Sequence, residues 1–234
     1  MKILKYPKFI SDLLIKRGFY RLVSQIDKTK GDDWSAFRTV DFLFSQTAEL
    51  ICPWQFKEEM MELANEVEVI QPRVVVEIGT ANGGTLFMAC RLAAKDALII
   101  SIDLPGGAFG GGYPEWKTPV YSSFAGKQQC IHLLRGSSHS TEIFNQLKTL
   151  LAGRKIDYLF IDGDHSYEGV KQDFEMYSVL TAKNAKVAFH DIVQHRDDSC
   201  NVHRFWSEIK LRYPYKEFVN DWNQKSFGVG VLNL

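Results

Sequence analysis

Acidic and histidine side chains directly follow two short apolar runs, and these residue types can do chemistry. In FIDGDHSYEG, residues 160–169, Asp162 and His165 come straight after a run that reads as a buried strand. His190 and Asp191 end the run KVAFHD in the same way. A histidine titrates near neutral pH and can take a proton from a hydroxyl, while two carboxylates can hold a divalent cation or the hydroxyl itself. The residues therefore predict proton transfer at the ends of two strands.

An alternating α/β pattern positions these residues. Amphipathic stretches long enough for helices separate five short apolar runs that each end in Gly or Asp: RVVVEIG, ALIISID, CIHLLRG, DYLFIDG and KVAFHD. Such alternation predicts a mainly parallel sheet covered by helices on both faces, and two further runs, YKEFV and SFGVGVLNL, predict a closing hairpin. Ligands of such sheets bind outside the carboxyl ends of the strands. We therefore expect Asp162, His165 and Asp191 on a ligand-binding rim.

The turn after the first strand, EIGTANGGT (Glu77–Thr85), is the expected cofactor position, although its glycines also fit a plain strand-to-helix turn. The dinucleotide pattern G-x-G-x-x-G is broken, because Ala81 stands where the second glycine belongs. Glu77 would repel a pyrophosphate but suits a ligand that carries an ammonium and a sulfonium. Asp103 closes the second strand, where a carboxylate can accept both ribose hydroxyls. GSSHS, Gly136–Ser140, can bond an adenine edge or cap a helix.

Together these motifs resemble the class I S-adenosylmethionine-dependent methyltransferases, from about Gln55 to the C-terminus. Glu77, Gly79 and Gly83 look like the family's first motif, with Ala81 in place of its usual middle glycine. More narrowly, SIDLPGGAFGGGYPEW, FIDGDHSYEGV and AFHDI are similar to the cephalosporin-hydroxylase-like branch, which includes sugar and natural-product O-methyltransferases. The resemblance implies an α/β, Rossmann-like three-layer sandwich with a mostly parallel seven-stranded sheet and an antiparallel last strand. It also implies S-adenosylmethionine held by Glu77, Gly79, Ala81, Gly83, Thr85, Asp103, Gly136, Ser138 and Asp162.

The resemblance further implies methyl transfer to a hydroxyl of a sugar or a glycosylated natural product. His165 would act as general base, while Asp162 and Asp191 would hold the acceptor hydroxyl or a divalent metal. The catechol-type branch has Asn after its second Asp, where this chain has Ile192, so His190 is the substitute ligand. Mg²⁺ prefers oxygen ligands, whereas a His ligand favours manganese, iron or zinc.

Simpler and rival interpretations stand beside these. Asp164 can cap the helix that starts near Ser166, and His190 can be a buried residue bonded to the backbone. Tyr167 and Lys171 form the Y-x-x-x-K spacing of NAD-dependent sugar oxidoreductases, but on the helix after the fourth strand rather than the fifth. A non-catalytic partner protein that keeps the nucleotide fold is a further alternative. A polar loop outside the site accounts for four more residues: His195, Asp197, Asp198 and His203.

The N-terminal part differs in character from the rest. Residues 1–50 predict a helical extension, followed by the methyltransferase domain at 51–234. Residues 1–30 hold eight Lys or Arg against two Asp, with apolar residues at helical spacing. Such a helix docks on the main domain or on a second subunit, or lies on an anionic membrane. Four aromatic residues suggest that it covers another surface: Trp34, Phe37, Phe42 and Phe44.

Composition narrows the remaining choices. Equal numbers of basic and acidic residues, 28 each, leave no net field that would attract nucleic acid. The four cysteines form no C-x-x-C pair, which predicts reduced thiols. No run approaches the ~20 apolar residues of a membrane span, so we expect a cytoplasmic protein with a small-molecule substrate. The glycine-rich stretch Leu104–Trp116 leaves the predicted rim and reads as a lid over cofactor and substrate.

Overall fold

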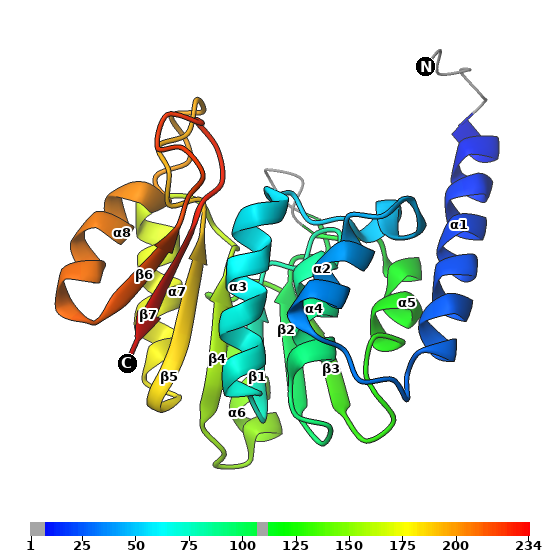
Figure 1. The fold of residues 1–234 in the computed structure, drawn as a ribbon. Helices are drawn as coiled ribbons and strands as arrows, with labels where there is room; N and C mark the ends of the chain where they lie inside the picture. Colours follow the sequence, from blue (N-terminus) through cyan, green and yellow to red (C-terminus); the bar gives the residue numbers. More distant parts are fainter. Residues whose placement is uncertain (1–7, 107–111) are drawn as a thin grey trace.

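Seven strands form one sheet, as the sequence predicts. The structure, a computed structural model, describes residues 8–106 and 112–234, with side chains from Ile15 onward. The strand order is β3-β2-β1-β4-β5-β7-β6 (Figure 1). β7 runs antiparallel to both of its neighbours, and the other pairs are parallel. The mostly parallel sheet with an antiparallel last strand is therefore confirmed.

The apolar runs of the sequence become the strands, with small shifts at their ends. The strands are β1 Val74–Ile78, β2 Leu98–Asp103, β3 Cys130–Arg135, β4 Ile156–Ile161, β5 Thr181–His190, β6 Tyr215–Phe218 and β7 Val229–Asn233. The α-helices are α1 Lys8–Lys28, α2 Ala36–Leu43, α3 Lys57–Ile70, α4 Gly84–Leu92, α5 Thr118–Ser122, α6 Thr141–Leu151, α7 Tyr167–Ser178 and α8 Val202–Ile209. Short 3₁₀ turns include η1 Gln46–Ile51, η3 Glu115–Lys117 and η4 Lys210–Arg212.

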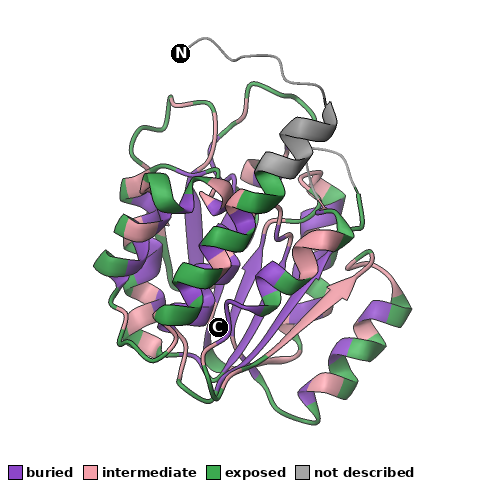
Figure 2. Ribbon diagram, turned by 90° about the vertical axis from the view of Figure 1, so that its right-hand side faces the viewer, coloured by how far each residue is buried: buried purple, intermediate pink, exposed green. Residues whose placement is uncertain are grey.

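The alternation of side chains along each strand builds two hydrophobic cores. Val75 of β1 joins the cluster under α1 to α5, whereas Val74 and Val76 join the cluster under α6 to α8. The central strands are buried on both faces, while the outward faces of the helices are exposed (Figure 2). The molecule is thus the three-layer α/β sandwich that the sequence predicts.

The N-terminal helices share the core of the sheet. Phe19, Leu22 and Ile26 of α1 are buried in the same cluster as α4 and the central strands. Phe37 is exposed, but the other three aromatic residues of this region pack on that core: Trp34, Phe42 and Phe44. No helix in the described ranges is long and apolar enough to cross a membrane. The domain boundary at residue 50, a second subunit and contact with a membrane surface stay predictions.

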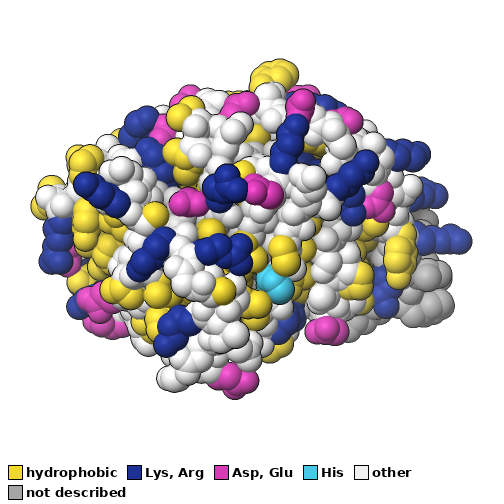
Figure 3. Space-filling model, turned by 90° about the horizontal axis from the view of Figure 1, so that it is seen from below, with side chains coloured by type: hydrophobic (Ala, Val, Ile, Leu, Met, Phe, Trp, Pro, Cys, Tyr) yellow, Lys and Arg dark blue, Asp and Glu magenta, His cyan; other side chains and the backbone are white. Residues whose placement is uncertain are grey.

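The loops that follow β1, β2, β4 and β5 gather along one edge of the sheet, the upper edge in Figure 1. The strand order reverses between β1 and β4, which is where ligands bind in open α/β sheets. On the opposite edge, seen in Figure 3, the described basic and acidic side chains are interspersed. The predicted lid, Leu104–Trp116, lies partly outside the described residues, because 107–111 are not among them.

Candidate active site

The turn between β1 and α4 is built from residues in the left-handed region of backbone conformation. Gly79 has φ +86°, and a Cβ there would stand 1.9 Å from the carbonyl oxygen of Asp162. Gly83 has φ +88° and caps α4, and a Cβ there would meet the Tyr121 ring. Ala81, the residue that replaces the family's middle glycine, takes φ 43° at some cost in strain. Glycine is therefore required at Gly79 by close packing against the end of β4.

Glu77 is a buried acid at the end of β1, with an exposed fraction of 1%. The Thr80 hydroxyl donates to its Oε2 at 2.8 Å and the Thr85 hydroxyl to its Oε1 at 2.6 Å. Burial raises the pKa of Glu77 to about 8, although both hydroxyls favour the ionised form. Thr80 and Thr85 line a cavity at this edge of the sheet, whereas Glu77 is not among the described residues that do. The predicted ammonium contact of Glu77 is therefore screened by the two threonine side chains.

Asp103, at the end of β2, ties this turn to the loop that follows β2. Its Oδ2 accepts the backbone N–H groups of Thr80 at 3.2 Å and Ala81 at 3.0 Å, and its Oδ1 accepts that of Gly112 at 3.0 Å. Burial raises the pKa of Asp103 against the lowering effect of these hydrogen bonds. Asp103 lines the cavity, so its carboxylate can both shape the turn and accept hydrogen bonds from hydroxyls of a ligand.

The segment after β3 supplies the far side of the same cavity, where Gly136 and Ser138 line the wall. A Cβ on Gly136 would stand 2.7 Å from Ile143, so α6 packs tightly behind it. Ser140, not Ser138, caps α6, because its side chain accepts the N–H of Glu142. The Ser138 side chain is thus not used as the cap. The backbone carbonyl of Ser138 accepts a hydrogen bond from the Tyr177 hydroxyl at 2.7 Å.

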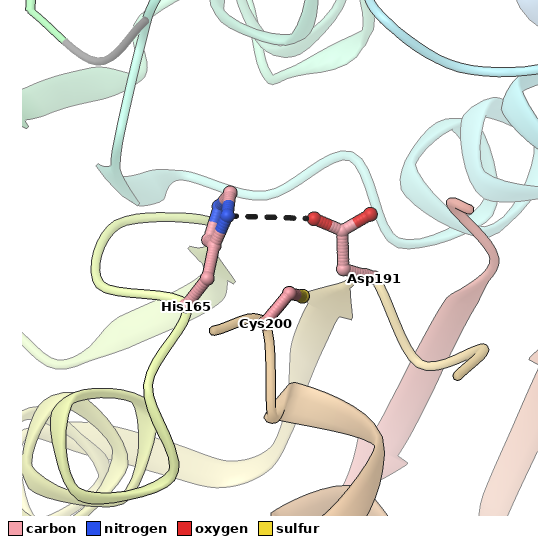
Figure 4. A group of neighbouring side chains, drawn as sticks. All are labelled: His165, Asp191 and Cys200. Carbon is pink, nitrogen blue, oxygen red and sulfur yellow. Dashed lines mark ion pairs between the residues drawn. The ribbon is translucent and has the colours of Figure 1, made fainter. Parts of the chain in front are cut away.

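Asp162, His165 and Asp191 meet at the rim, as the sequence predicts. His165 Nε2 lies 3.2 Å from Asp162 Oδ1, and its Nδ1 lies 3.7 Å from Asp191 Oδ2, the pair drawn in Figure 4. Burial opposes charge on the ring, but the two carboxylates outweigh it and raise the pKa of His165. Cys200 lies beside this pair, and burial raises the pKa of its thiol to about 12, which keeps it protonated. Asp191 holds φ 60°, a strained backbone of the kind found at functional sites.

His190 bridges the two acids from inside the wall. Its Nδ1 lies 3.2 Å from both Asp162 Oδ1 and Asp191 Oδ1. Its Nε2 lies 3.1 Å from the backbone carbonyl of Trp54 and also contacts Oε1 of Gln55. Burial disfavours charge on this ring, yet the two carboxylates raise the pKa of His190 well above its usual value. His190 therefore combines the two roles that the sequence left open: one ring nitrogen is bonded to the backbone and the other faces both acids.

The donor set at this point fits a divalent cation. Asp162, His190 and Asp191 each offer one ligand atom, and these atoms lie within 4.8 Å of one another. His190 would use Nδ1 while Nε2–H is held by acceptors behind it, which is how metal-bound histidines are usually oriented. Burial disfavours charge on Asp191, but the His190 charge and hydrogen bonds from His190 and His195 outweigh it and hold the pKa of Asp191 well below its usual range. The carboxylate is therefore available as an anion. A metal ion would take the place of the proton on His190 Nδ1, because a histidine binds metal in its neutral form.

Some site residues were missed from the sequence. His195 was assigned to a polar loop, but its Nε2 lies 2.8 Å from Asp191 Oδ1 and it lines the cavity, as does Asp197. The spacing of four residues from Asp191 was the available signal, although no helix connects the two. Asp164 accepts the N–H of Ser166 at 2.9 Å, so it forms the turn before α7, and Ser166 is the cap.

Asp198 with His203 and the Tyr167–Lys171 pair lie away from the cavity. Asp198 is exposed and His203 lies on α8, and neither is among the described residues lining the cavity. Tyr167 donates its hydroxyl to Glu208 on α8 at 2.7 Å, and Lys171 stacks above the Tyr167 ring. This tyrosine also is not among the described residues that line the cavity. The Y-x-x-x-K pair is thus a surface contact between α7 and α8.

One cavity of about 430 Å³ joins these groups. The turn after β1, Asp103 and the segment after β3 line one part of it, and Asp162, His165, His190 and Asp191 line another. Segments far away in the sequence contribute further wall residues, among them Pro53, Trp54, Gln55, Phe227 and Val229. A volume of this size is ordinary for a small-molecule site.

Comparison with known sequences gives a family for this geometry. A family model described as a methyltransferase domain matches residues 76–192, half of the chain. Uncharacterized protein y4gI of Sinorhizobium fredii (strain NBRC 101917 / NGR234) is 28% identical over 163 residues, which cover 64% of this chain and 17% of that protein. Uncharacterized protein R132 of Acanthamoeba polyphaga mimivirus is 35% identical over 121 residues, 52% of each chain. The match spans about half or less of the length of these curated relatives.

Solved structures of methyltransferases share the fold. An O-methyltransferase from Bacillus cereus in complex with SAH superposes with a TM-score of 0.55 at 13% identity, covering 84% of this chain and 90% of that one. CalS11, a TDP-rhamnose 3'-O-methyltransferase of calicheamicin biosynthesis, superposes with a TM-score of 0.53 at 16% identity, covering 91% and 92%. At these identities the likeness concerns the fold alone.

Proposed function

This chain belongs to the family of methyltransferase domains, and we propose that it transfers a methyl group from S-adenosylmethionine to a hydroxyl of a sugar or a glycosylated natural product. One observation carries the proposal. The glycine turn with Asp103, which suits a nucleoside, and the His165 pair with Asp162 and Asp191, which suits a hydroxyl, line the same cavity. The fold neighbour that methylates a TDP-rhamnose supports the sugar class.

One part of the cavity, lined by the turn after β1, Asp103 and the segment after β3, is the cofactor half, and its residues would hold and orient the donor. When bound, S-adenosylmethionine supplies a methyl group on a sulfonium, whose leaving group needs no further activation. Asp103 would accept ribose hydroxyls, and Gly136 with Ser138 would face the adenine. Glu77 would act through the Thr80 and Thr85 hydroxyls, which it orients by accepting their hydrogen bonds. Alignment of donor and acceptor then removes much of the barrier.

The other part of the cavity, lined by Asp162, His165, His190 and Asp191, is the acceptor half, and its residues would remove a proton. His165 would accept the proton of the attacking hydroxyl, and the carboxylates of Asp162 and Asp191 on either side would stabilise the imidazolium that forms. A divalent metal, when bound, lowers the pKa of a hydroxyl. Asp162, His190 and Asp191 would hold it, and the nitrogen ligand favours manganese, iron or zinc over magnesium.

The alternative functions have less support. A sugar oxidoreductase needs the Tyr167 hydroxyl at its cofactor, but this hydroxyl is bonded to Glu208. A non-catalytic partner protein would have no need for two histidines and two acids arranged around one cavity.

A thermal-shift titration tests the cofactor, with S-adenosylhomocysteine and NADH added separately, each with Mn²⁺ or with EDTA. A ligand at a hundred times its Kd stabilises the folded state by ~2.7 kcal/mol, which raises Tm by about 5–10 °C for a chain of this size. A shift with S-adenosylhomocysteine alone supports the proposal, and mass spectrometry of sugar and phenol acceptors incubated with S-adenosylmethionine then identifies the class methylated. A shift with NADH alone would overturn it.

A further inference from the structure

A buried acid outside the rim, Glu59 of α3, gathers N–H donors from two distant segments. Its exposed fraction is 1%. Oε1 accepts the backbone N–H of Asn220 at 2.9 Å and the side-chain amide of Gln224 at 2.8 Å. Oε2 accepts the backbone N–H of Gly228 at 3.1 Å and the side-chain amide of Gln55. In the described ranges no basic side chain pairs with Glu59, so these four donors alone compensate the loss of hydration of the carboxylate.

This arrangement fixes the direction of the Gln55 amide. An ionised carboxylate only accepts hydrogen bonds, so the Gln55 nitrogen must face Glu59. The Gln55 oxygen then faces Nε2 of His190, which must donate. The carbonyl of Trp54 makes the same demand on Nε2. As a result, Nδ1 is the ring atom that faces Asp162 and Asp191.

The same acid holds residues 219–228, the loop between β6 and β7, against the site. Asn220 and Gly228 are bonded at the two ends of this loop. Near its end, Lys225 has φ 62° and Phe227 has φ 61°, which are unfavourable for these residue types. The Phe227 N–H donates to Asp191 Oδ1 at 3.1 Å. The loop therefore contacts the rim directly, in a conformation that needs an anchor.

We propose that Glu59 is a positioning residue that couples the seating of loop 219–228 to the orientation of His190. With the loop seated, the Glu59 carboxylate turns Gln55 so that its oxygen holds the His190 ring from behind. The wall of the acceptor half and the His190 ligand atom are then set by one buried charge. The consequence for catalysis rests on the proposed function, whereas the coupling itself can be measured in the protein without ligand.

Two variants and one control separate the parts of this coupling. In Glu59→Gln, the new NH₂ group replaces one carboxylate oxygen and must face the backbone N–H of either Asn220 or Gly228, so that amide loses its acceptor. The remaining neutral oxygen holds the other donors less strongly than a carboxylate does, and the hold on the Gln55 amide is weakened with them. Gln55→Met removes the link to His190 together with one of the four Glu59 donors, and it leaves the Asn220 and Gly228 donors that hold the loop. Glu62→Gln changes an exposed acid on the same helix. Two signals are measured without cofactor or metal: hydrogen exchange of the loop amides, and the ¹⁵N-resolved Nε2–H proton of the His190 ring.

We expect Glu59→Gln to accelerate exchange of the Asn220 and Gly228 amides and of the His190 Nε2–H proton, each by about tenfold or more. Gln55→Met should accelerate only the His190 proton, and Glu62→Gln should change neither. If Glu59→Gln frees the loop but leaves the His190 signal unchanged, Glu59 anchors the loop and no coupling exists. An unchanged His190 signal in Gln55→Met also overturns the proposal, even where Glu59→Gln does not fold.

Binding of S-adenosylhomocysteine separates this inference from the proposed function. In the described ranges Glu59 bonds to Gln55, Asn220, Gln224 and Gly228, and to no residue of the cofactor half. All three variants should therefore bind S-adenosylhomocysteine within about twofold of the unmodified chain. If the unmodified chain does not bind S-adenosylhomocysteine, the proposed function is wrong. The coupling between Glu59 and His190 is still tested, because it is measured without ligand. Loss of binding in Glu59→Gln alone would mean that this variant disturbs the whole fold. The His190 signal of Gln55→Met then decides whether Gln55 orients the ring.

Discussion

Replacing the buried Glu77 by Gln should stabilise the protein without ligand. Burial raises the pKa of Glu77 from 4.5 to about 8, so the native state holds a proton there that the unfolded chain has released at neutral pH. Gln has the shape of the protonated acid: its oxygen accepts from one threonine hydroxyl, and its NH₂ group, like the acid O–H, donates to the other, which turns to accept. Unlike Glu77, it has no proton to take up on folding.

The magnitude follows from linkage between protonation and folding. Between pH 4.5 and pH 8 the native state binds more protons than the unfolded state, so the free energy of unfolding falls by about 1.4 kcal/mol for each pH unit. At pH 7 the Glu77 chain should therefore be less stable than Glu77→Gln by about 3 kcal/mol. The difference should widen by about 2 kcal/mol from pH 6 to pH 8, which is about 4–8 °C in Tm for a chain of this length.

Thermal or urea unfolding of the two proteins at pH 6, 7 and 8 measures this difference. Other groups titrate equally in both proteins, so only the gap between the two curves reports Glu77. Parallel curves would refute the reasoning, because they would mean that the threonine hydroxyls keep Glu77 ionised with an ordinary pKa. Addition of S-adenosylhomocysteine should narrow the gap, since a nearby ammonium favours the ionised acid.

Three further substitutions, the first with a matched control, test the rim. Gly79→Ala should lower the free energy of unfolding by about 3 kcal/mol or more, because its Cβ would stand 1.9 Å from a carbonyl oxygen. The control Gly153→Ala, with φ +83° and open space around it, should lower it by only about 1 kcal/mol. Equal losses of the two variants in urea unfolding would contradict this. His165→Ala should reduce methyl transfer by about 10²–10⁴-fold with unchanged S-adenosylhomocysteine affinity by calorimetry, and an active variant would exclude it as the base. Asp191→Asn should weaken Mn²⁺ binding, followed by electron paramagnetic resonance, by about tenfold or more; unchanged affinity would remove Asp191 as a ligand.

The part of the site that the sequence predicts is the part that the sheet positions. Asp103 ends β2, and Asp162 and Asp191 directly follow β4 and β5. Parallel strands bring their carboxyl ends to one edge of the sheet whatever the loops do. The period of the apolar runs was therefore enough to place these acids together, and His165 followed from its position three residues after Asp162.

The rest depends on contacts that no local pattern encodes. Gln55 and His190 are 135 residues apart, and Glu59 and Gly228 are 169 apart, yet each pair is joined by a hydrogen bond. A Gln and a Glu at the start of a helix are ordinary surface residues by type, so nothing marked them before the fold was known. His195 was missed for a related reason, because it lies in an irregular loop where spacing does not give direction.

This division has a physical consequence for specificity. The groups proposed to hold the cofactor are fixed by strand register and by a glycine turn that packs against β4, so they tolerate little variation. The acceptor half is closed by Trp54, Gln55 and Phe227, which come from a segment before α3 and from the β6–β7 loop. These two segments are joined to each other through Glu59 and not through the sheet. Changes of acceptor can therefore arise there while the cofactor half stays intact, provided that the buried Glu59 keeps its donors.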